Sequence, residues 1–331
     1  MARRLIIATL VTISFAPFSV QYLHAKDYPT KPIEIIVPFG AGGSLDLEAR
    51  ITAENAKKYL GQPMVVLNKV GAGGTVGATE VVRSKPDGYK LLFYASTYFA
   101  TTIKAQNVSF DPNYLVPLIN FAEERSGFVV KGDAPWKTLG ELLDYGKQNP
   151  GKLRWTHTGR GIAPHINQLL LFRRAGVDTI DIPYKSSTEQ LAAVLGGHTD
   201  GSSTIYVAAK ENYRSGNLKF LVTHSTRRYA DTSSIPCQTE LGFPNPILMY
   251  HGFFIHRDTP EDIKKNLFDV LKKTYDDPEF KKQAEQIGTE LCFGGAEFLR
   301  DSIKKAEEVG VPILKEVGLY DKSWDSKSGI K

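Results

Sequence analysis

A glycine-rich loop at residues 40–43 (GAGG) is the first stretch that could bind a small molecule. It follows Ile33–Val37, a nearly continuous apolar run that favours a strand buried on both faces of a parallel sheet. Pro38 ends that strand because it has no N–H to donate, and Ser44 or Asp46 can cap the helix that follows. Such a helix start leaves N–H groups free at the positive end of the helix dipole. We therefore predict that the loop helps to hold a carboxylate; the alternative is a purely structural turn.

A second candidate loop is Thr158–Gly161 (TGRG), which follows a short predicted strand at residues 153–156. Arg160 can grip a carboxylate with two parallel hydrogen bonds, unless it simply points to solvent. His157 and His165 lie at the same loop and helix start. For His165, ligand contact and a structural hydrogen bond are equally good interpretations.

Enzymatic chemistry finds little support in the sequence. The glycine loops do not form GxGxxG or a Walker motif, and GxSxG and HExxH are absent. A hydrolase would need Ser44 or Ser96 as nucleophile and His165 as base, with no third group in sight. Because there is also no CxxC or histidine-rich cluster, we predict no enzyme, no metal and no cofactor.

The elements that position the first loop form an alternating pattern. Strands are predicted at residues 33–37, 63–68 and 89–95, with helices between them. This order implies parallel pairing with right-handed crossovers, and ligands of such sheets bind at the carboxyl ends of strands. Gly40–Asp46 and Ala95–Thr97 both follow such ends.

The rest of the chain continues this alternation. Thr138 with Glu141 predicts a capping box, and Thr259 with Pro260 predicts a helix start with an N-cap and Pro at N1. Ser202–Thr204 is a hydroxyl cluster at a third strand end, where ordinary turn chemistry is the alternative. Strands are predicted at 115–122, 127–130, 153–156, 179–184, 199–205, 219–222 and 251–255, and helices at 136–148, 164–175, 189–195, 206–214, 259–276, 278–288 and 297–315.

The chain begins with a predicted export signal. Arg3 and Arg4 precede an apolar run at 5–20 that is too short for a membrane anchor, and cleavage is expected after Ala25. The 331 residues suffice for two domains, and the net charge of +5 falls to +3 without the two leader arginines. No basic, aromatic-interleaved face indicates nucleic acid.

Cys237 and Cys292 are the two cysteines of the chain. Either they form a disulfide, which export to an oxidising compartment would permit, or they are two buried free thiols. The sequence leaves both open.

Short motifs along the mature chain carry a resemblance to a known family. They are Tyr28-Pro29, Lys31-Pro32-Ile33, Val37-Pro38-Phe39, Gly42-Gly43 with Asp46, Gly61-Gln62-Pro63, Asn68, Gly71–Gly74, Pro86–Tyr89, Pro150–Leu153, Gly159, Gly161, Pro164-His165 and Pro183–Lys185. The chain resembles the solute receptors of tripartite tricarboxylate transporters, also called Bug-type periplasmic binding proteins, over nearly all of its mature length.

The resemblance implies two doubly wound α/β domains joined by crossing strands, a hinged architecture like that of type II periplasmic binding proteins. The domains would close on a small organic acid, held by the loops Phe39–Ser44 and Thr158–Ala163, with Ser96 and Thr97 as a further ligand-side turn. The partner would be a two-component membrane carrier that takes up the acid. The chain itself would act as a monomer.

Departures from the family pattern point to the kind of ligand. Many relatives carry an aspartate where Thr204 stands, Arg160 replaces an often neutral residue, and His157 replaces a small one. These changes predict a ligand with two carboxylates and no ammonium group. Phe39, with Tyr98 and Trp155, could line an apolar middle, so an aromatic dicarboxylate such as terephthalate is a candidate.

Together these arguments predict a periplasmic receptor with a first domain of residues 26–125 and 223–331 and a second of residues 126–222. Two other functions are weighed: a ligand-sensing partner of a periplasmic signalling protein, and a secreted hydrolase. The predicted ligand site comprises Phe39, Ala41, Gly42, Gly43, Ser44, Asp46, Ser96, Thr97, His157, Thr158, Gly159, Arg160, Gly161, Ile162, Ala163, His165, Ser203 and Thr204.

Overall fold

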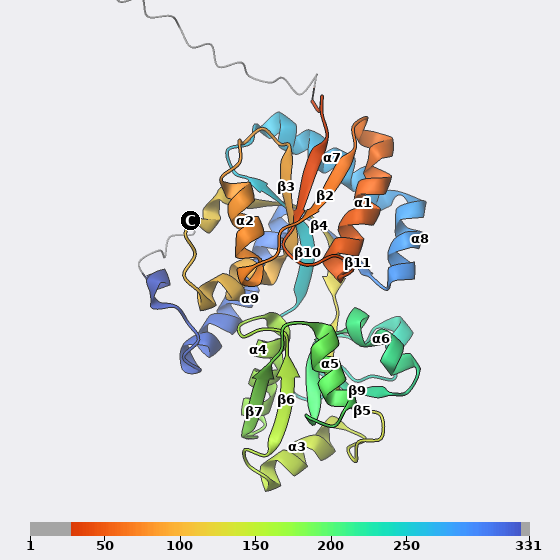
Figure 1. Ribbon diagram of the computed structural model, residues 1–331, viewed down its shortest axis with the longest axis vertical. Helices are drawn as coiled ribbons and strands as arrows, with labels where there is room; N and C mark the ends of the chain where they lie inside the picture. Colours follow the sequence, from red (N-terminus) through yellow and green to blue (C-terminus); the bar gives the residue numbers. More distant parts are fainter. Residues whose placement is uncertain (1–27, 326–331) are drawn as a thin grey trace, which may run out of the picture.

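The computed structural model describes residues 28–325, so the predicted export signal lies outside the described residues. Two sheets organise this part of the chain (Figure 1). We call the six-stranded sheet with its helices the first lobe, and the five-stranded sheet with its helices the second lobe. Within the described residues, no helix has the length and apolarity needed to cross a membrane.

The first lobe is built on the strand that the sequence placed before the glycine loop. That strand, β1 (Ile33–Val37), pairs in parallel with β2 (Met64–Asn68) and β3 (Lys90–Ala95), as predicted. The strand order is β11-β4-β10-β3-β1-β2, in which β4 (Leu115–Glu124), β10 (Met249–His256) and β11 (Glu290–Gly295) are added by antiparallel pairing.

The second lobe repeats this mixed arrangement. Its strand order is β7-β6-β8-β5-β9, and β6 pairs in parallel with both of its neighbours. The strands are β5 (Ser126–Lys131), β6 (Leu153–His157), β7 (Thr179–Pro183), β8 (Gly201–Ile205) and β9 (Leu218–Thr223).

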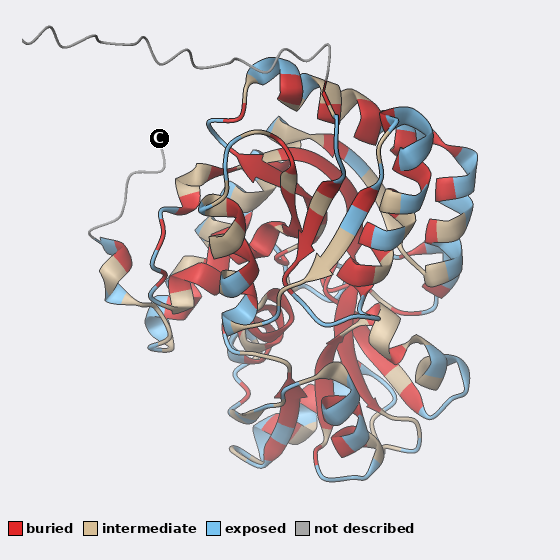
Figure 2. Cartoon of the chain, turned by 45° about the horizontal axis from the view of Figure 1, so that its top comes forward, coloured by how far each residue is buried: buried red, intermediate tan, exposed pale blue. Residues whose placement is uncertain are grey.

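Helices cover the sheets, so the central strands form the buried interior in Figure 2, whereas the edge strands β2, β7 and β11 are partly exposed. In the first lobe, α1 packs against α7 and α8, while α2 and α9 contact strands of the sheet. The helices are α1 (Ser44–Leu60), α2 (Thr75–Val82), α3 (Leu139–Gln148), α4 (Ala163–Arg174), α5 (Ser187–Leu195), α6 (Tyr206–Arg214), α7 (Glu261–Asp276), α8 (Pro278–Ile287) and α9 (Ala296–Glu316).

The chain passes between the lobes at two places. The first crossing is short, because Arg125 alone separates β4 from β5. The second leads from the end of β9 at Thr223 to the start of β10 at Met249. In addition, α9 of the first lobe packs against α4 of the second.

Two predicted helix starts were wrong in detail. Gly43 is the N-cap of α1, and neither Ser44 nor Asp46 caps it with its side chain. Helix α7 has Pro260 as its N-cap, and the buried hydroxyl of Thr259 has no hydrogen-bond partner in the described structure. By contrast, Thr138 accepts from the N–H of Glu141 and caps α3 as predicted.

The elements that were not predicted include the edge strand β11 and a short helical segment from Tyr98 to Ala105 after β3. Of the two possibilities for the cysteines, the structure shows free thiols: Cys237 is buried and Cys292 is partly buried.

Candidate functional site

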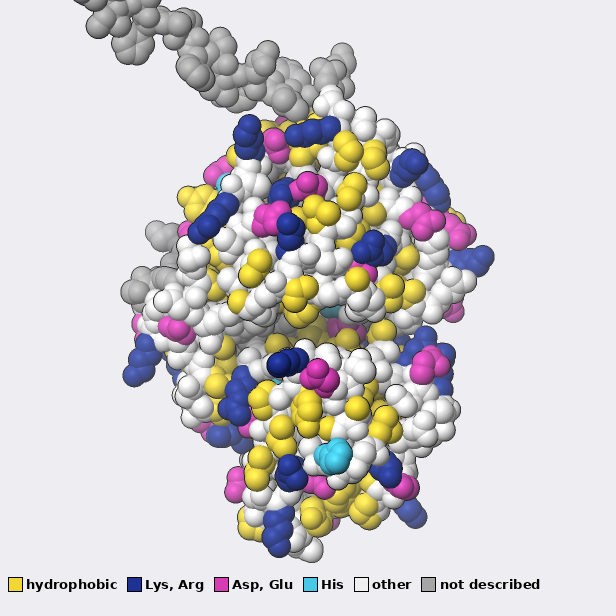
Figure 3. Space-filling view, viewed as in Figure 1, with side chains coloured by type: hydrophobic (Ala, Val, Ile, Leu, Met, Phe, Trp, Pro, Cys, Tyr) yellow, Lys and Arg dark blue, Asp and Glu magenta, His cyan; other side chains and the backbone are white. Residues whose placement is uncertain are grey.

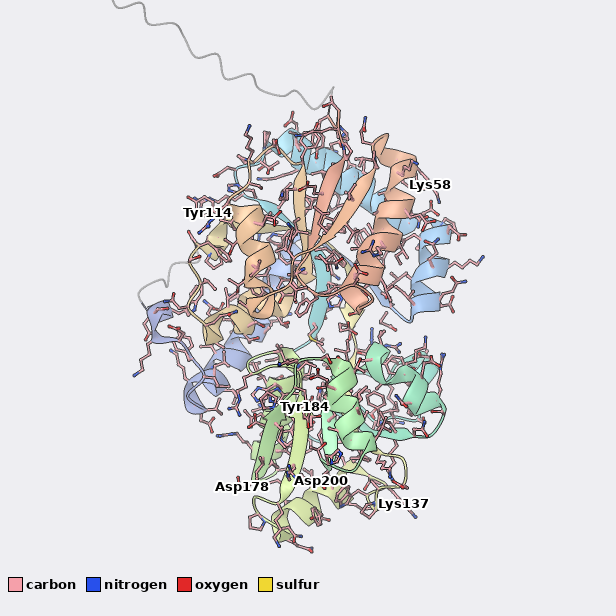
Figure 4. All side chains as sticks on the ribbon, in the orientation of Figure 1. Lys58, Tyr114, Lys137, Asp178, Tyr184 and Asp200 are labelled. Atoms are coloured by element: carbon pink, nitrogen blue, oxygen red, sulfur yellow. The ribbon has the colours of Figure 1, made fainter. Side chains whose placement is uncertain are left out.

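The site candidates lie where the two lobes meet. In Figure 4, Tyr184 follows β7 and lies near the first lobe, whereas Asp178 and Asp200, which precede β7 and β8, lie at the far end. The carboxyl ends of β6, β7 and β8 therefore point toward the first lobe, and β1 runs down toward the second (Figure 1). Figure 3 shows the surface hollowed along this junction, which we call the interlobe groove.

Contacts confirm that the second-lobe loop reaches the first lobe. A Cβ added at Gly161 would lie 3.0 Å from the Cβ of Ala105, in the helical segment after β3, and 3.7 Å from Leu314 of α9. Gly161 has φ +81°, a left-handed conformation that suits glycine.

Asp46 organises the loop between β1 and α1 from within. One oxygen, Oδ2, accepts from the Gly42 N–H at 2.9 Å and from Arg50 Nε at 3.0 Å, while Oδ1 accepts from Asn68 Nδ2 at 2.9 Å. The same Asn68 amide donates to the carbonyl of Phe39 at 2.9 Å. Asp46 was predicted as a ligand residue, but its buried carboxylate is already occupied by the loop, so its role here is to fix the loop's shape.

The charge on Asp46 is stabilised by this role. Burial alone would raise the pKa of Asp46, but the hydrogen bonds from Arg50, Gly42 and Asn68 hold it below its ordinary value. The carboxylate thus stays ionised, and both of its oxygens continue to accept hydrogen bonds from the loop and its neighbours.

The start of α1 offers unused donors. Because Gly43 provides no capping side chain, the N–H groups of Ser44 and Leu45 have no acceptor among residues 28–325. Above Gly40 and Gly42 there is open space, since a Cβ added at either would meet nothing within 4 Å. Free N–H groups, a positive dipole end and room beside them are what an anion requires.

The turn after β3 contributes buried hydroxyls. Ser96 and Thr97 are both buried, and Ser96 Oγ accepts from the N–H of Tyr250 at 3.2 Å. Tyr98 bonds to Thr75 through its hydroxyl at 3.0 Å and is buried.

Of the three aromatic side chains predicted to line the site, only Phe39 is exposed, at 40%. Trp155 is fully buried in the core of the second lobe, and its Nε1 donates to Thr179 at 3.0 Å. For Trp155 the predicted lining role was therefore wrong, because its strand turns that side chain into the core.

A polar cluster lies beneath the second loop, and it centres on Asp181 of β7. Its Oδ2 lies 3.0 Å from His157 Nε2, 3.6 Å from His165 Nε2 and 3.0 Å from a terminal nitrogen of Arg160. The two imidazoles lie against each other, with ring centroids 4.3 Å apart. Sequence reasoning missed Asp181, although a lone acid in the apolar run TIDIP was a usable signal.

The backbone fixes the tautomers of both histidines. His157 Nδ1 accepts the N–H of Gly159 at 3.1 Å, and His165 Nδ1 accepts the N–H of Gly161 at 3.3 Å. Since both Nδ1 atoms accept, each neutral ring carries its proton on Nε2 and directs it at Asp181. The amides of Gly159 and Gly161, two residues of the predicted ligand site, are therefore occupied by imidazoles.

The cluster is an ionised carboxylate held by two imidazoles and one guanidinium. Hydrogen bonds from His157 and His165 keep the pKa of Asp181 far below its ordinary value despite partial burial, and the Arg160 guanidinium adds to the effect. Burial lowers the pKa of His165, which favours its neutral form.

His157, His165 and Asp181 also bring their ligand atoms within 4.8 Å of one another, as a metal site would. The donor set does not suit a metal, however. A neutral histidine that binds through Nε2 must carry its proton on Nδ1, and here Nδ1 accepts from the backbone. The Arg160 charge on the same carboxylate oxygen opposes a cation further.

The remaining predicted residues support the start of α4. Ile162 is its N-cap without a side-chain hydrogen bond, and Ala163 is its first residue and fully buried. Ser203 donates to the carbonyl of Pro164 at 2.6 Å, and Thr204 accepts from Gln190 Nε2 at 2.8 Å. These two hydroxyls face other protein groups in the core of the second lobe.

A hydrolytic arrangement is not assembled. His165 has its ring nitrogens directed at Gly161 and Asp181, and Ser96 accepts from the backbone of the first lobe. Among the described residues, neither Ser44 nor Ser96 has a histidine within hydrogen-bond distance.

Comparisons with known proteins find relatives that match the sequence and the fold of the chain. Residues 48–319 match the model of the tripartite tricarboxylate transporter family receptor, TctC. A UPF0065 protein of Cupriavidus necator is 32% identical over 96% of this chain and 97% of its own. The structure of the periplasmic binding protein BugD is 29% identical, with a TM-score of 0.76 over 88% of this chain and 99% of that one. The structure of MatC of Rhodopseudomonas palustris with bound malate is 26% identical, with a TM-score of 0.73 over 85% of this chain and 99% of that one.

Proposed function

The chain belongs to the receptor family of tripartite tricarboxylate transporters, whose members are periplasmic solute receptors, and we propose that it captures a small dicarboxylate in the interlobe groove. One carboxylate would bind at the start of α1 and the other near Arg160 of the second lobe. The malate in MatC supports a ligand of this class.

The observation that carries the proposal is the pair of unused donors in the two lobes. In the first lobe, the Ser44 and Leu45 amides have no acceptor among the described residues. In the second, Arg160 reaches Asp181 through one terminal nitrogen, and its side chain is 49% exposed. Its Nε and second terminal nitrogen remain available for a carboxylate, which arginine binds in a planar, two-point geometry.

The ion pair with Asp181 fixes the orientation of the Arg160 side chain and partly neutralises its positive charge. A ligand must therefore supply a full negative charge at this end to compete for the guanidinium, which favours two carboxylates over one. With Trp155 in the core and Phe39 as the exposed aromatic, an aliphatic chain fits this groove better than the aromatic ring of terephthalate.

Capture would close the groove by a hinge at the two crossings, between a domain of residues 26–125 and 223–331 and a domain of residues 126–222. A ligand that contacts both lobes stabilises the closed form by its differential affinity. Delivery would then be to the membrane components of a tripartite carrier, with a periplasmic sensor as the alternative partner.

A ligand screen with a matched variant pair tests the proposal. Malate, adipate, terephthalate and citrate are compared with their monocarboxylate counterparts by thermal shift, and affinities are measured by calorimetry. Arg160→Ala should weaken a dicarboxylate by about 10- to 100-fold, since a hydrogen bond to a charged group contributes roughly 1.5–3 kcal/mol, and should barely affect the monocarboxylate.

The control is Arg154→Ala, which removes an exposed arginine from β6, the strand that leads into the loop of Arg160. It should leave both affinities unchanged. Equal losses for the dicarboxylate and the monocarboxylate in Arg160→Ala would exclude the second-carboxylate role, and the absence of binding by any of these acids would exclude the function.

A further inference from the structure

Three buried ionisable side chains meet in the first lobe, outside the residues discussed so far. They are Glu48 of α1, Glu124 at the end of β4 and His251 of β10, none more than 8% exposed. His251 Nδ1 lies 2.8 Å from Glu48 Oε2, and His251 Nε2 lies 3.8 Å from Glu124 Oε2. One imidazole thus lies between two carboxylates.

This cluster connects the hinge to the ligand helix. Glu124 directly precedes Arg125, the single residue of the first crossing. The side chain of Ser44, the first residue of α1 and one helical turn before Glu48, lies close enough to the Glu124 carboxylate to lower its pKa. The proposed ligand carboxylate would bind the Ser44 N–H, so the two carboxylates would share one serine.

The cluster holds one carboxylate more than its cations balance. Burial and the nearby Glu48 raise the pKa of Glu124, while His251, Ser44 and Arg125 lower it less. Burial would lower the pKa of His251, but Glu48 and Glu124 more than offset this and raise it.

Neighbouring groups do not remove the surplus charge on Glu124. The Arg125 guanidinium bonds to Asp231 at 2.5 Å and to the Gly288 carbonyl at 3.2 Å. Glu48 is shared between His251 and the Thr289 hydroxyl, which donates to it at 3.0 Å.

We propose, on the basis of the proposed function, that capture of a carboxylate at the start of α1 is coupled to the uptake of one proton by Glu124. A ligand anion bound at the Ser44 N–H places a second negative charge next to Glu124 in a site with little water. The proton comes from solvent and binds a Glu124 oxygen, and no other bond is made or broken. The protonated carboxyl can then donate to Ser44 Oγ, which frees the serine hydroxyl to donate to the ligand.

Calorimetry in buffers of different ionisation enthalpy measures the coupling. The probe is whichever of malate, adipate and terephthalate binds most tightly, because all are fully ionised above neutral pH. The wild-type protein should take up as much as one proton per ligand, and its affinity should fall by up to tenfold for each pH unit above neutrality.

Glu124→Gln keeps the shape of the side chain and removes the titration. It should bind the same probe with no proton uptake from this site and with an affinity that is independent of pH over that range. The matched control is Glu123→Gln, the adjacent buried carboxylate, which bonds instead to Tyr229 at 2.7 Å and Arg227 at 3.1 Å. It should retain the wild-type uptake and pH dependence.

Several outcomes would overturn the inference. Binding by the wild type without proton uptake defeats it while the proposed function stands, as does unchanged uptake in Glu124→Gln. Should Glu124→Gln not fold, the wild-type affinity between about pH 7 and pH 9 decides, because an affinity that does not change with pH would exclude the coupling. If the wild type binds none of these acids, both the inference and the proposed function fail.

Discussion

His224, the first residue after β9, gives a sharp test of how the second crossing is stabilised. It is buried, with Nε2 3.0 Å from Gln168 Oε1 and Nδ1 3.3 Å from Ser126 Oγ. These partners come from α4 and from the start of β5, so the imidazole ties the second crossing to two elements of the second lobe. Burial lowers the pKa of His224 to about 3.

The sign of the effect follows from that depressed pKa. The unfolded chain binds a proton at this histidine below about pH 6.5, whereas the folded protein does not, so the folded state loses stability as pH falls through that range. At about pH 5 the loss is about 2 kcal/mol, from ~1.4 kcal/mol per pH unit over the roughly 1.5 units below 6.5. Because pH 5 lies above the native pKa, this figure depends on the unfolded-state value and hardly on how low the native one is.

Urea unfolding of the wild type and His224→Gln near pH 7.5 and pH 5 measures the difference. The variant should be less stable near pH 7.5, since it cannot keep both hydrogen bonds, but it should lose about 2 kcal/mol less on acidification. His198→Gln, at an exposed histidine, should lose as much as the wild type. Equal acid losses in wild type and His224→Gln would refute the reasoning.

Two further substitutions test the loops. Asp46→Ala should reduce the free energy of unfolding by about 2–4 kcal/mol and weaken ligand binding, because Gly42, Arg50 and Asn68 lose their acceptor. Urea unfolding measures the stability and calorimetry the affinity. A change in stability below about 0.5 kcal/mol would contradict the role given to Asp46. Gly161→Ala should lower the free energy of unfolding by about 1–3 kcal/mol, since the new Cβ combines a positive φ with a 3.0 Å contact to Ala105. The control, Gly176→Ala, lies at φ +70° in open space and should cost only the backbone strain of about 1 kcal/mol. Equal costs in urea unfolding would mean that the loop does not pack tightly against the first lobe.

The strands and helices were largely predictable because hydrophobic periodicity decides them. Helix α6 begins and ends at the predicted residues, and β1 does too. The strand β11 was not predictable, since Glu290–Gly295 is short and ends in two glycines. It is stabilised by antiparallel pairing with β4, where the contacting residues Asn120 and Cys292 are 172 positions apart in the sequence. Such long-range pairing leaves no local pattern.

The positions of the site loops were also predictable, but the use of their amides was not. A glycine loop before a helix signals free N–H groups, and the sequence does not say which of them the protein keeps for itself. Asp181 lies 24 residues from His157, and only the parallel pairing of β6 with β7 brings them together. The sequence shows that Arg160 departs from the family pattern, but its ion pair with Asp181 could be identified only from the folded structure.

The two loops nevertheless share one local device, which explains why some glycine amides are closed to the ligand and others are open. In each loop a glycine with positive φ donates its N–H to a polar side chain four residues later, in the first turn of the helix: Gly42 to Asp46, and Gly161 to His165. This contact fixes the loop, and neither Gly43 nor Ile162 caps its helix with a side chain. The first amides of α1 are therefore unused, whereas in α4 the second residue, Pro164, has no N–H to offer. The acceptor is a carboxylate in one lobe and an imidazole in the other. Each lobe nevertheless has one acidic side chain near its helix start, Asp46 in the first and Asp181 in the second, and each is paired with an arginine, Arg50 or Arg160. In both lobes, therefore, an arginine offsets the negative charge of the protein where a ligand carboxylate would bind.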